Sequence, residues 1–203
     1  MPMLDLANGY YELPAGKLLN VVICLEMKSR PKGTAAGLPE GFELKRLGPG
    51  DLATHRAIFR EVGADLMWFS RLIMADEKLK FVLADPDVES YAVMQGAIPV
   101  GILELNFREK IECELAFFGI SQKAIGTGLG RALMNEALQL AWARPINRVW
   151  VHTCHYDHPR ALGFYQKAGF KPYARMIEVH DDPRASGHLP KDAAAHVPMV
   201  DIS

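Results

Sequence analysis

The chain of 203 residues carries 23 Lys and Arg against 24 Asp and Glu, for a formal net charge of -1. This balance offers no electrostatic case for a nucleic-acid partner, which calls for a clearly basic domain. Because no apolar run approaches the roughly 18 residues of a membrane-spanning helix, we expect no membrane partner either. A hydrophobic content of 49% is enough for one sizeable core.

The first forty residues predict a β-hairpin and a linker. The hairpin covers residues 10–27 and turns at Pro14-Ala15-Gly16. Residues 28–41 are rich in Lys, Gly, Pro and Ala, as is typical of a linker. A hairpin placed before the main domain would either pair across a homodimer or cover a sheet edge, and the residues do not decide between these two arrangements.

The remaining pattern mixes strands and helices. Strands joined by short turns must run antiparallel, whereas two strands joined through a crossover helix run parallel. In chain order we expect a strand at 42–47, helical regions at 51–62 and 65–83, strands at 90–95, 98–107 and 111–119, a helix ending near 143, a strand at 148–154, a helix at 160–168 and a strand from 170.

Three alternating glycines, Gly126, Gly128 and Gly130, stand directly before an apolar-periodic helix. Glycines let the backbone approach a ligand closely, and a helix N-terminus attracts anions such as phosphate. A P-loop would need Lys and Ser or Thr after the last glycine, where this chain has Arg131 and Ala132. The order G-x-G-x-G also differs from the dinucleotide fingerprint. We infer a turn that holds a pyrophosphate.

A second motif follows about thirty residues later, where the stretch from Ala161 to Phe170 fits A-x-x-x-Y-x-x-x-G-F. The two motifs, in this order, resemble the GNAT superfamily of N-acetyltransferases over roughly residues 42–180. The chain departs from the family in two places. Ile125 replaces the usual Arg or Gln at the head of the glycine turn, and His158, beside Asp157, replaces a common Asn. The first departure removes a side-chain contact to the pyrophosphate and leaves the backbone donors.

The resemblance implies an α/β fold with a mixed, mostly antiparallel sheet, helices on both faces and a splayed pair of parallel strands. It implies acetyl-CoA, or a related acyl-CoA, bound in the V between those strands. The chain then divides into an N-terminal extension at 1–41, an acetyltransferase domain at 42–180 and a tail at 181–203. The expected cofactor-binding residues are Phe118, Ile120, Ile125, Gly126, Thr127, Gly128, Leu129, Gly130, Arg131, His158 and Phe164.

The implied reaction transfers an acetyl group to a primary amine of a small molecule or a peptide, by direct attack in a ternary complex. An amine is mostly protonated at neutral pH, so a base must first remove its proton. Strand alternation puts Glu114 on the same face as Phe118, and by its alternation Glu104 of the preceding strand could face the same cleft. Both are candidate bases, although both would equally be solvated strand residues without a catalytic role. Tyr165 occupies the family's position for the general acid that protonates the leaving thiolate.

Trp68 and Arg71 lie in the helical region that, in this family, forms one wall of the acceptor pocket. Together they would suit a planar or anionic acceptor, although the Trp side chain would also serve simply to pack a helix on the sheet. Two other functions are weighed against catalysis: a non-catalytic acyl-CoA-binding or regulatory module, and a nucleotide-binding regulator. The presence of Tyr165 and Glu114 argues against the first, and the missing P-loop lysine against the second.

We expect no metal site. His152, His155 and His158 recur at a spacing of three, but the first belongs to a strand and Pro159 interrupts any helix. The cysteines also lack metal-type spacing, so we expect reduced thiols in a cytoplasmic protein. They are Cys24, Cys113 and Cys154.

Overall fold

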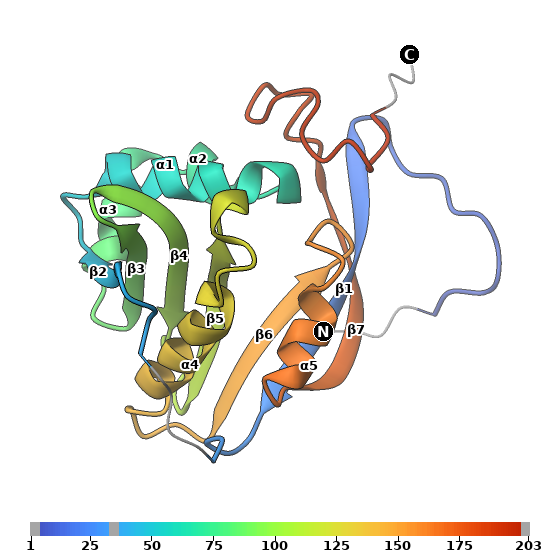
Figure 1. Cartoon of the computed structure of the whole chain (residues 1–203). Helices are drawn as coiled ribbons and strands as arrows, with labels where there is room; N and C mark the ends of the chain where they lie inside the picture. Colours follow the sequence, from blue (N-terminus) through green and yellow to red (C-terminus); the bar gives the residue numbers. More distant parts are fainter. Residues whose placement is uncertain (1–4, 33–36, 200–203) are drawn as a thin grey trace.

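The computed structural model describes residues 5–32 and 37–199 and contains a seven-stranded sheet (Figure 1). In chain order the strands are β1 (Lys17–Met27), β2 (Phe42–Leu47), β3 (Val88–Gln95), β4 (Ile98–Asn106), β5 (Glu112–Ile120), β6 (Arg148–Cys154) and β7 (Lys171–Asp181). They lie in the order β2-β3-β4-β5-β6-β1-β7. Every neighbouring pair is antiparallel except β5 and β6, which are parallel. The predicted mixed, mostly antiparallel sheet is therefore confirmed.

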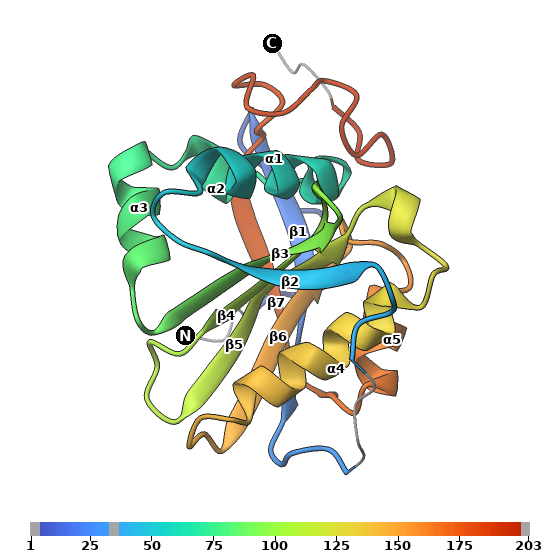
Figure 2. The ribbon, with the colours of Figure 1, turned by 60° about the vertical axis from the view of Figure 1, so that its left-hand side comes forward.

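Helices cover both faces of the sheet, as expected (Figure 2). Ile102 and Leu103, consecutive residues of β4, point to opposite faces. Ile102 packs against the first helix and Leu103 packs in the cluster of the fourth, so these helices lie on different faces. One group is α1 (Leu52–Gly63), α2 (Ser70–Ile73) and α3 (Asp76–Ala84); the other is α4 (Leu129–Ala141) and α5 (Ala161–Lys167). Two short 3-10 helices are η1 (Ala64–Leu66) and η2 (Gln122–Ala124).

The largest hydrophobic cluster lies under α4 and α5. Helix α4 buries one stripe of side chains at spacings of three and four, as an amphipathic helix does. Leu129 and Leu133 in this stripe are fully buried. Each such burial stabilises the fold by about 1.5–3 kcal/mol. The stripe therefore fixes the helix that follows the glycine turn, and with it the position of the turn.

The predicted N-terminal hairpin is wrong. A turn does form at Pro14, whose carbonyl accepts a hydrogen bond from the Lys17 N–H. Residues 5–13, however, form no strand, and Tyr10 is fully exposed. Strand β1 instead lies inside the sheet, paired with β6 on one side and β7 on the other. Because both of its edges are already paired, no edge is left for a hairpin partner.

The helical region predicted at 65–83 is divided into short segments. Met67 adopts a left-handed conformation with φ of 60°, which ends η1 and turns the chain. Trp68 then folds back on the end of α1, where a Cβ on Gly63 would lie 2.5 Å from the Trp68 Cβ. Only glycine allows this approach. The turn places Trp68 and the following residues along the open side of β5.

After β7 the chain continues without helix or strand in residues 182–199 (Figure 1). This segment folds around a buried arginine. Arg184 is 2% exposed; its guanidinium donates to both carboxylate oxygens of Asp182 and to the carbonyls of Ala193 and Val197. Burial opposes charge on Asp182, yet the hydrogen bonds from Arg184 hold its pKa below the usual value. This C-terminal segment, residues 182–198, packs in one hydrophobic cluster with Met67 and Tyr156.

We expect Arg184→Met to destabilise the protein by about 3–5 kcal/mol, because it leaves a buried carboxylate and two carbonyls without their donor. The free energy of unfolding is measured by urea titration followed by circular dichroism. Lys191→Met removes an exposed cation from the same segment and serves as the control. Equal urea midpoints for the two variants would contradict the structural role of Arg184.

Candidate active site

The site is built where β5 and β6 separate. The two parallel strands pair only from Glu112 with Arg148 to Glu114 with Trp150, and their remaining residues diverge. The predicted splayed pair is thus present. Backbone groups of the diverging segments are not used in a ladder between the two strands, so they are available to a ligand lying in the V.

A β-bulge lies in β5 at the point of divergence. Leu105 of β4 pairs with Leu115, whereas the preceding Glu104 pairs with Phe117, so Ala116 is an extra residue without an opposite partner. A bulge reverses the alternation of side chains beyond it. Phe118 consequently packs with the α4 and α5 cluster, whereas Phe117 packs with α1.

The prediction that Glu114 and Phe118 share a face is therefore wrong. Glu114 lies on the α1 face, where it accepts a hydrogen bond from Asn106 at 3.0 Å and approaches His152 of β6 at 4.0 Å. The residues gave no sign of the bulge, which is a property of the pairing of β5 with β4.

The glycine turn has the expected shape. Gly126 and Gly128 have φ of 86° and 84°, a backbone conformation that residues with a Cβ rarely adopt. Gly128 is the residue before α4, and Thr127 Oγ1 accepts the N–H of Leu129 while donating to the carbonyl of Ala124. The first-turn N–H groups of Gly130 and Arg131 have no intrahelical acceptor by helix geometry, so they face the turn as donors.

The loop after β6 and helix α5 supply the facing side of the site. Asp157 is held at this strand end, because its carboxylate accepts from the Thr153 hydroxyl at 2.7 Å and from the Cys154 N–H at 3.0 Å. His158 caps the loop by accepting the Arg160 N–H. Burial raises the pKa of Tyr165, and the charge of Asp157 raises it further, so its phenol keeps its proton at neutral pH.

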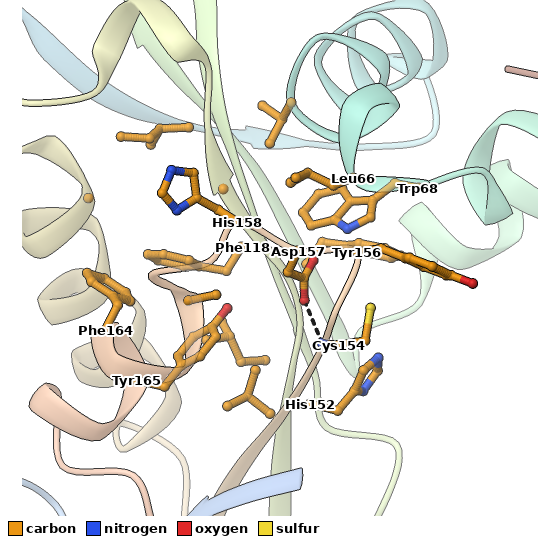
Figure 3. A pocket seen from close by; sticks show the side chains of 18 of the residues that line it. Leu66, Trp68, Phe118, His152, Cys154, Tyr156, Asp157, His158, Phe164 and Tyr165 are labelled. Carbon is orange, nitrogen blue, oxygen red and sulfur yellow. Dashed lines mark hydrogen bonds between the residues drawn. The ribbon is translucent and has the colours of Figure 1, made fainter. Parts of the chain in front are cut away.

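A cavity of about 1180 Å³ passes through the V and joins both faces of the sheet. In Figure 3, Phe118, Phe164 and Tyr165 stand on one side of it and Trp68 on the other, with the Tyr165 hydroxyl directed into the pocket. The cavity brings together most of the predicted site residues. Those that line it are Trp68, Arg71, Glu114, Phe118, Ile120, Ile125, Gly126, Gly128, Gly130, Arg131, His158, Phe164 and Tyr165.

Glu104 does not line this cavity, so its predicted role as a base is not supported. Its side chain is 1% exposed and lies beneath α1 and α2, where Arg71 binds it at 2.5 Å and His55 Nε2 lies 3.5 Å away. Burial alone would raise the pKa of Glu104, yet the contacts with His55 and Arg71 hold it below the usual value. An enclosed, ion-paired carboxylate is not available to take a proton from an acceptor amine.

Several lining residues escaped the sequence analysis because they come from the two terminal parts of the chain. Asn20 of β1 donates to Glu178 of β7 at 2.8 Å, and His180 lies with its ring 5.3 Å from that of Phe69. Asn20, Glu178 and His180 all line the cavity. The only available signal was the polar position of Asn20 within an apolar strand, which is uninformative until the strand's neighbours are known.

The histidines do not gather around a metal. The His155 ring accepts the backbone N–H of Val21, and His158 accepts that of Arg160. Across residues 5–32 and 37–199, no group of three His, Cys, Asp or Glu is arranged to hold a metal ion.

The model of the acetyltransferase (GNAT) family matches residues 56–170, more than half of the chain. The chain belongs to the GNAT family. The match runs from α1 to the end of the second motif and supports acyl transfer as the general activity of this GNAT domain. No curated protein matches the chain.

Solved structures share the GNAT fold at low sequence identity. A GCN5-related N-acetyltransferase from Sphaerobacter thermophilus is 16% identical with a TM-score of 0.61, covering 80% of this chain and 52% of that one. An acetyltransferase from Thermus thermophilus is 20% identical with a TM-score of 0.51, covering 69% and 96%. An aminoglycoside acetyltransferase from an uncultured soil metagenomic sample is 19% identical with a TM-score of 0.54, covering 64% and 88%.

This GNAT chain spans between 52% and 63% of the length of the first three structures it matches. In the parts of the chain described by the structure, no helix is long and apolar enough to cross a membrane.

Cys154 lines the cavity, and burial together with the nearby Asp157 raises its pKa to about 11. Because the thiolate is the reactive form, we expect iodoacetamide to alkylate native Cys154 about tenfold faster for each unit of pH between 7 and 10. Mass spectrometry of the peptide measures the rate, and the urea-unfolded chain is the control. A rate that levels off near pH 8.5 in the native protein would contradict the raised pKa.

Proposed function

We propose that the chain transfers an acetyl group from acetyl-CoA to a primary amine, which attacks directly in a ternary complex. The observation that carries this proposal is the cavity through the V, since it joins the glycine turn on one face to a wall with a carboxylate and aromatic rings on the other. Holding both reactants side by side supplies much of the rate enhancement in such a reaction.

The residues around the glycine turn suit the diphosphate of acetyl-CoA. A Cβ on Gly126 or Gly128 would meet no protein atom within 4 Å, so the positive φ of these residues serves the turn rather than internal packing. Arg131, Arg160 and Lys167 also line the cavity and add positive charge. In this assignment the N–H groups at the start of α4 hold the diphosphate, and the diverging part of β5 at Phe118 and Ile120 faces the pantetheine arm.

Acetyl-CoA supplies the thioester; the chain supplies proton transfer and orientation. Glu114 stands on the α1 face at the last paired position of β5, where it can take the amine proton directly or through water. The backbone beside Phe118 donates to the oxyanion. Tyr165 stands across the V on the other face, protonated by virtue of its raised pKa, and donates its proton to the departing thiolate.

The acceptor lies along the wall formed by Trp68 and Arg71. The ring centroids of Trp68 and Phe117 are 5.3 Å apart, and the Arg71 guanidinium carbon lies 5.1 Å from the centroid of the same Phe117 ring. The acceptor is a small-molecule or peptide amine that fits between this wall and the carboxylate of Glu114.

The cofactor assignment is tested by calorimetric titration with acetyl-CoA. We expect Gly128→Val to lose binding by at least about tenfold, because a β-branched residue at φ of 84° distorts the turn. Gly96→Val is the control, since Gly96 also has positive φ but belongs to the turn between β3 and β4. Equal affinity of both variants would show that the diphosphate binds elsewhere.

The acid and base assignments are tested by steady-state kinetics with amine acceptors and by thiol release. We expect Tyr165→Phe and Glu114→Gln each to lower kcat by about 10²- to 10⁴-fold while acetyl-CoA affinity changes little. Parallel loss of turnover and affinity in the Tyr165 variant would make Tyr165 a packing residue. Acetyl-CoA binding without turnover of any amine would favour a non-catalytic acyl-CoA-binding module.

A further inference from the structure

Arg71 is held rigidly in the wall of the acceptor pocket. Its Nη2 donates to Glu104 at 2.5 Å, and its guanidinium carbon lies 5.1 Å from the centre of the Phe117 ring. The side chain is 15% exposed, and the exposed part belongs to the cavity. An ion pair below and an aromatic ring beside it therefore fix the plane of this guanidinium.

The two side chains beneath Arg71 are ionisable and buried, so folding must remove them from water. Glu104 and His55 are 1% and 0% exposed, and His55 Nδ1 has no hydrogen-bond partner in the described residues. A buried ion pair contributes little net stability, because desolvation offsets the attraction between its charges. What this arrangement does provide is a fixed orientation for a cation at the cavity surface.

Most of the donors of Arg71 are left unused. A guanidinium has five N–H donors, and among the described residues it donates a hydrogen bond only to Glu104. Its Nε is enclosed and finds no acceptor in the described chain. The N–H groups of its terminal nitrogens, which are not enclosed in this way, can bind oxygen acceptors of a ligand in the cavity.

The opposite charge stands further along the same face of β5. Glu114 and Phe117 are three residues apart, about 10 Å at the rise of a strand. Glu114 contacts Asn106 and His152, and within residues 5–32 and 37–199 it forms no ion pair with an arginine. The pocket thus offers a carboxylate for an amine at one end and guanidinium donors at the other.

We propose that the acceptor is an amine that also carries a carboxylate, and that Arg71 binds that carboxylate. The proposal rests on the proposed acetyl transfer and deepens it by naming the class of acceptor. A carboxylate fits better than a phosphate dianion because Glu104 already balances the charge of Arg71, so one further negative charge is best accommodated. Trp68 and Phe117 cover the apolar part of the acceptor between its two charged ends. Glu104 is a positioning residue that acts through Arg71.

The test compares amines that differ only in the carboxylate: phenylalanine with 2-phenylethylamine, and 4-aminobutyrate with butylamine. For wild type we expect a higher kcat/KM for the carboxylated member of at least one pair. Arg71→Met should lower kcat/KM for that member about 10- to 100-fold, and for the plain amine by less than about threefold. Arg56→Met is the matched control, since Arg56 pairs with Asp76 and does not line the cavity.

The positioning role of Glu104 has its own readout. Glu104→Ala should weaken the preference for the carboxylated amine, and Glu104→Gln, which keeps an acceptor for Arg71, should restore most of it. Circular dichroism and acetyl-CoA titration show whether each variant is folded. An equal loss of kcat/KM with both amines in any of these variants would mean that Arg71, Glu104 and His55 only support the fold, and would overturn the proposal.

Calorimetry with the amines alone separates this proposal from the proposed function. If wild type acetylates none of the amines, acetyl transfer to amines of this kind fails, but the carboxylated member should still bind about tenfold tighter than its plain partner. That difference should vanish in Arg71→Met. Equal binding of the two members by wild type, or a wild-type preference for plain amines, would overturn the role of Arg71 whatever the activity.

Discussion

The early separation of β5 from β6 is the constraint on which the rest of the site depends. Arg148 closes the narrow end of the V, since it donates to Glu26 of β1 and to Glu112 of β5 at 2.8 Å each. Beyond Trp150 the two strands share no ladder. The bulge at Ala116 turns β5 at the same place, so a cavity opens where hydrogen bonds between the strands would otherwise stand.

The wide end of the V is held by parts of the chain that are distant in sequence. Strand β1 occupies a central place beside β6, so β7 becomes the edge strand and the chain continues from it past the open end (Figure 1). The C-terminal segment, residues 182–198, forms one hydrophobic cluster with Met67, which follows η1, and with Tyr156, which follows β6. Arg184 keeps this segment folded, so the two walls of the pocket are joined at both ends without a strand ladder between them.

Local chemistry determined what the sequence could predict. The glycine turn and the motif around Tyr165 are each short, continuous stretches whose backbone demands are set by their own residues, so their local structure was predicted correctly. The placement of β1 was not predictable, because its polar and apolar pattern suits an internal strand as well as a hairpin. Only the pairing with β6 and β7 distinguishes the two.

Long-range pairing also decided the roles of the two glutamates. Simple alternation along 111–119 gives Glu114 the face of Phe118, and one unpaired residue at Ala116 reverses that assignment. Glu104 has a strand pattern like that of Glu114, yet α1 and α2 cover it and leave it enclosed with Arg71. Whether a strand carboxylate lines the cavity or is a buried counter-ion is thus set by the helix above it.

The charges of the cavity divide along the same line as the two faces of the sheet. Arg131 of α4 and Arg160 and Lys167 at the two ends of α5 line the cavity. Glu114 lies on the α1 face, where no Lys or Arg of the described residues pairs with it. A field of this form would favour the proposed polyanion on the face of α4 and α5 and the proposed protonated amine on the face of α1. Because the negative charge of Glu104 balances the positive charge of Arg71, Arg71 does not repel the proposed amine from the wall that it forms with Trp68. The remaining N–H groups of Arg71 can orient an acceptor by hydrogen bonds, although the ion pair carries little net charge.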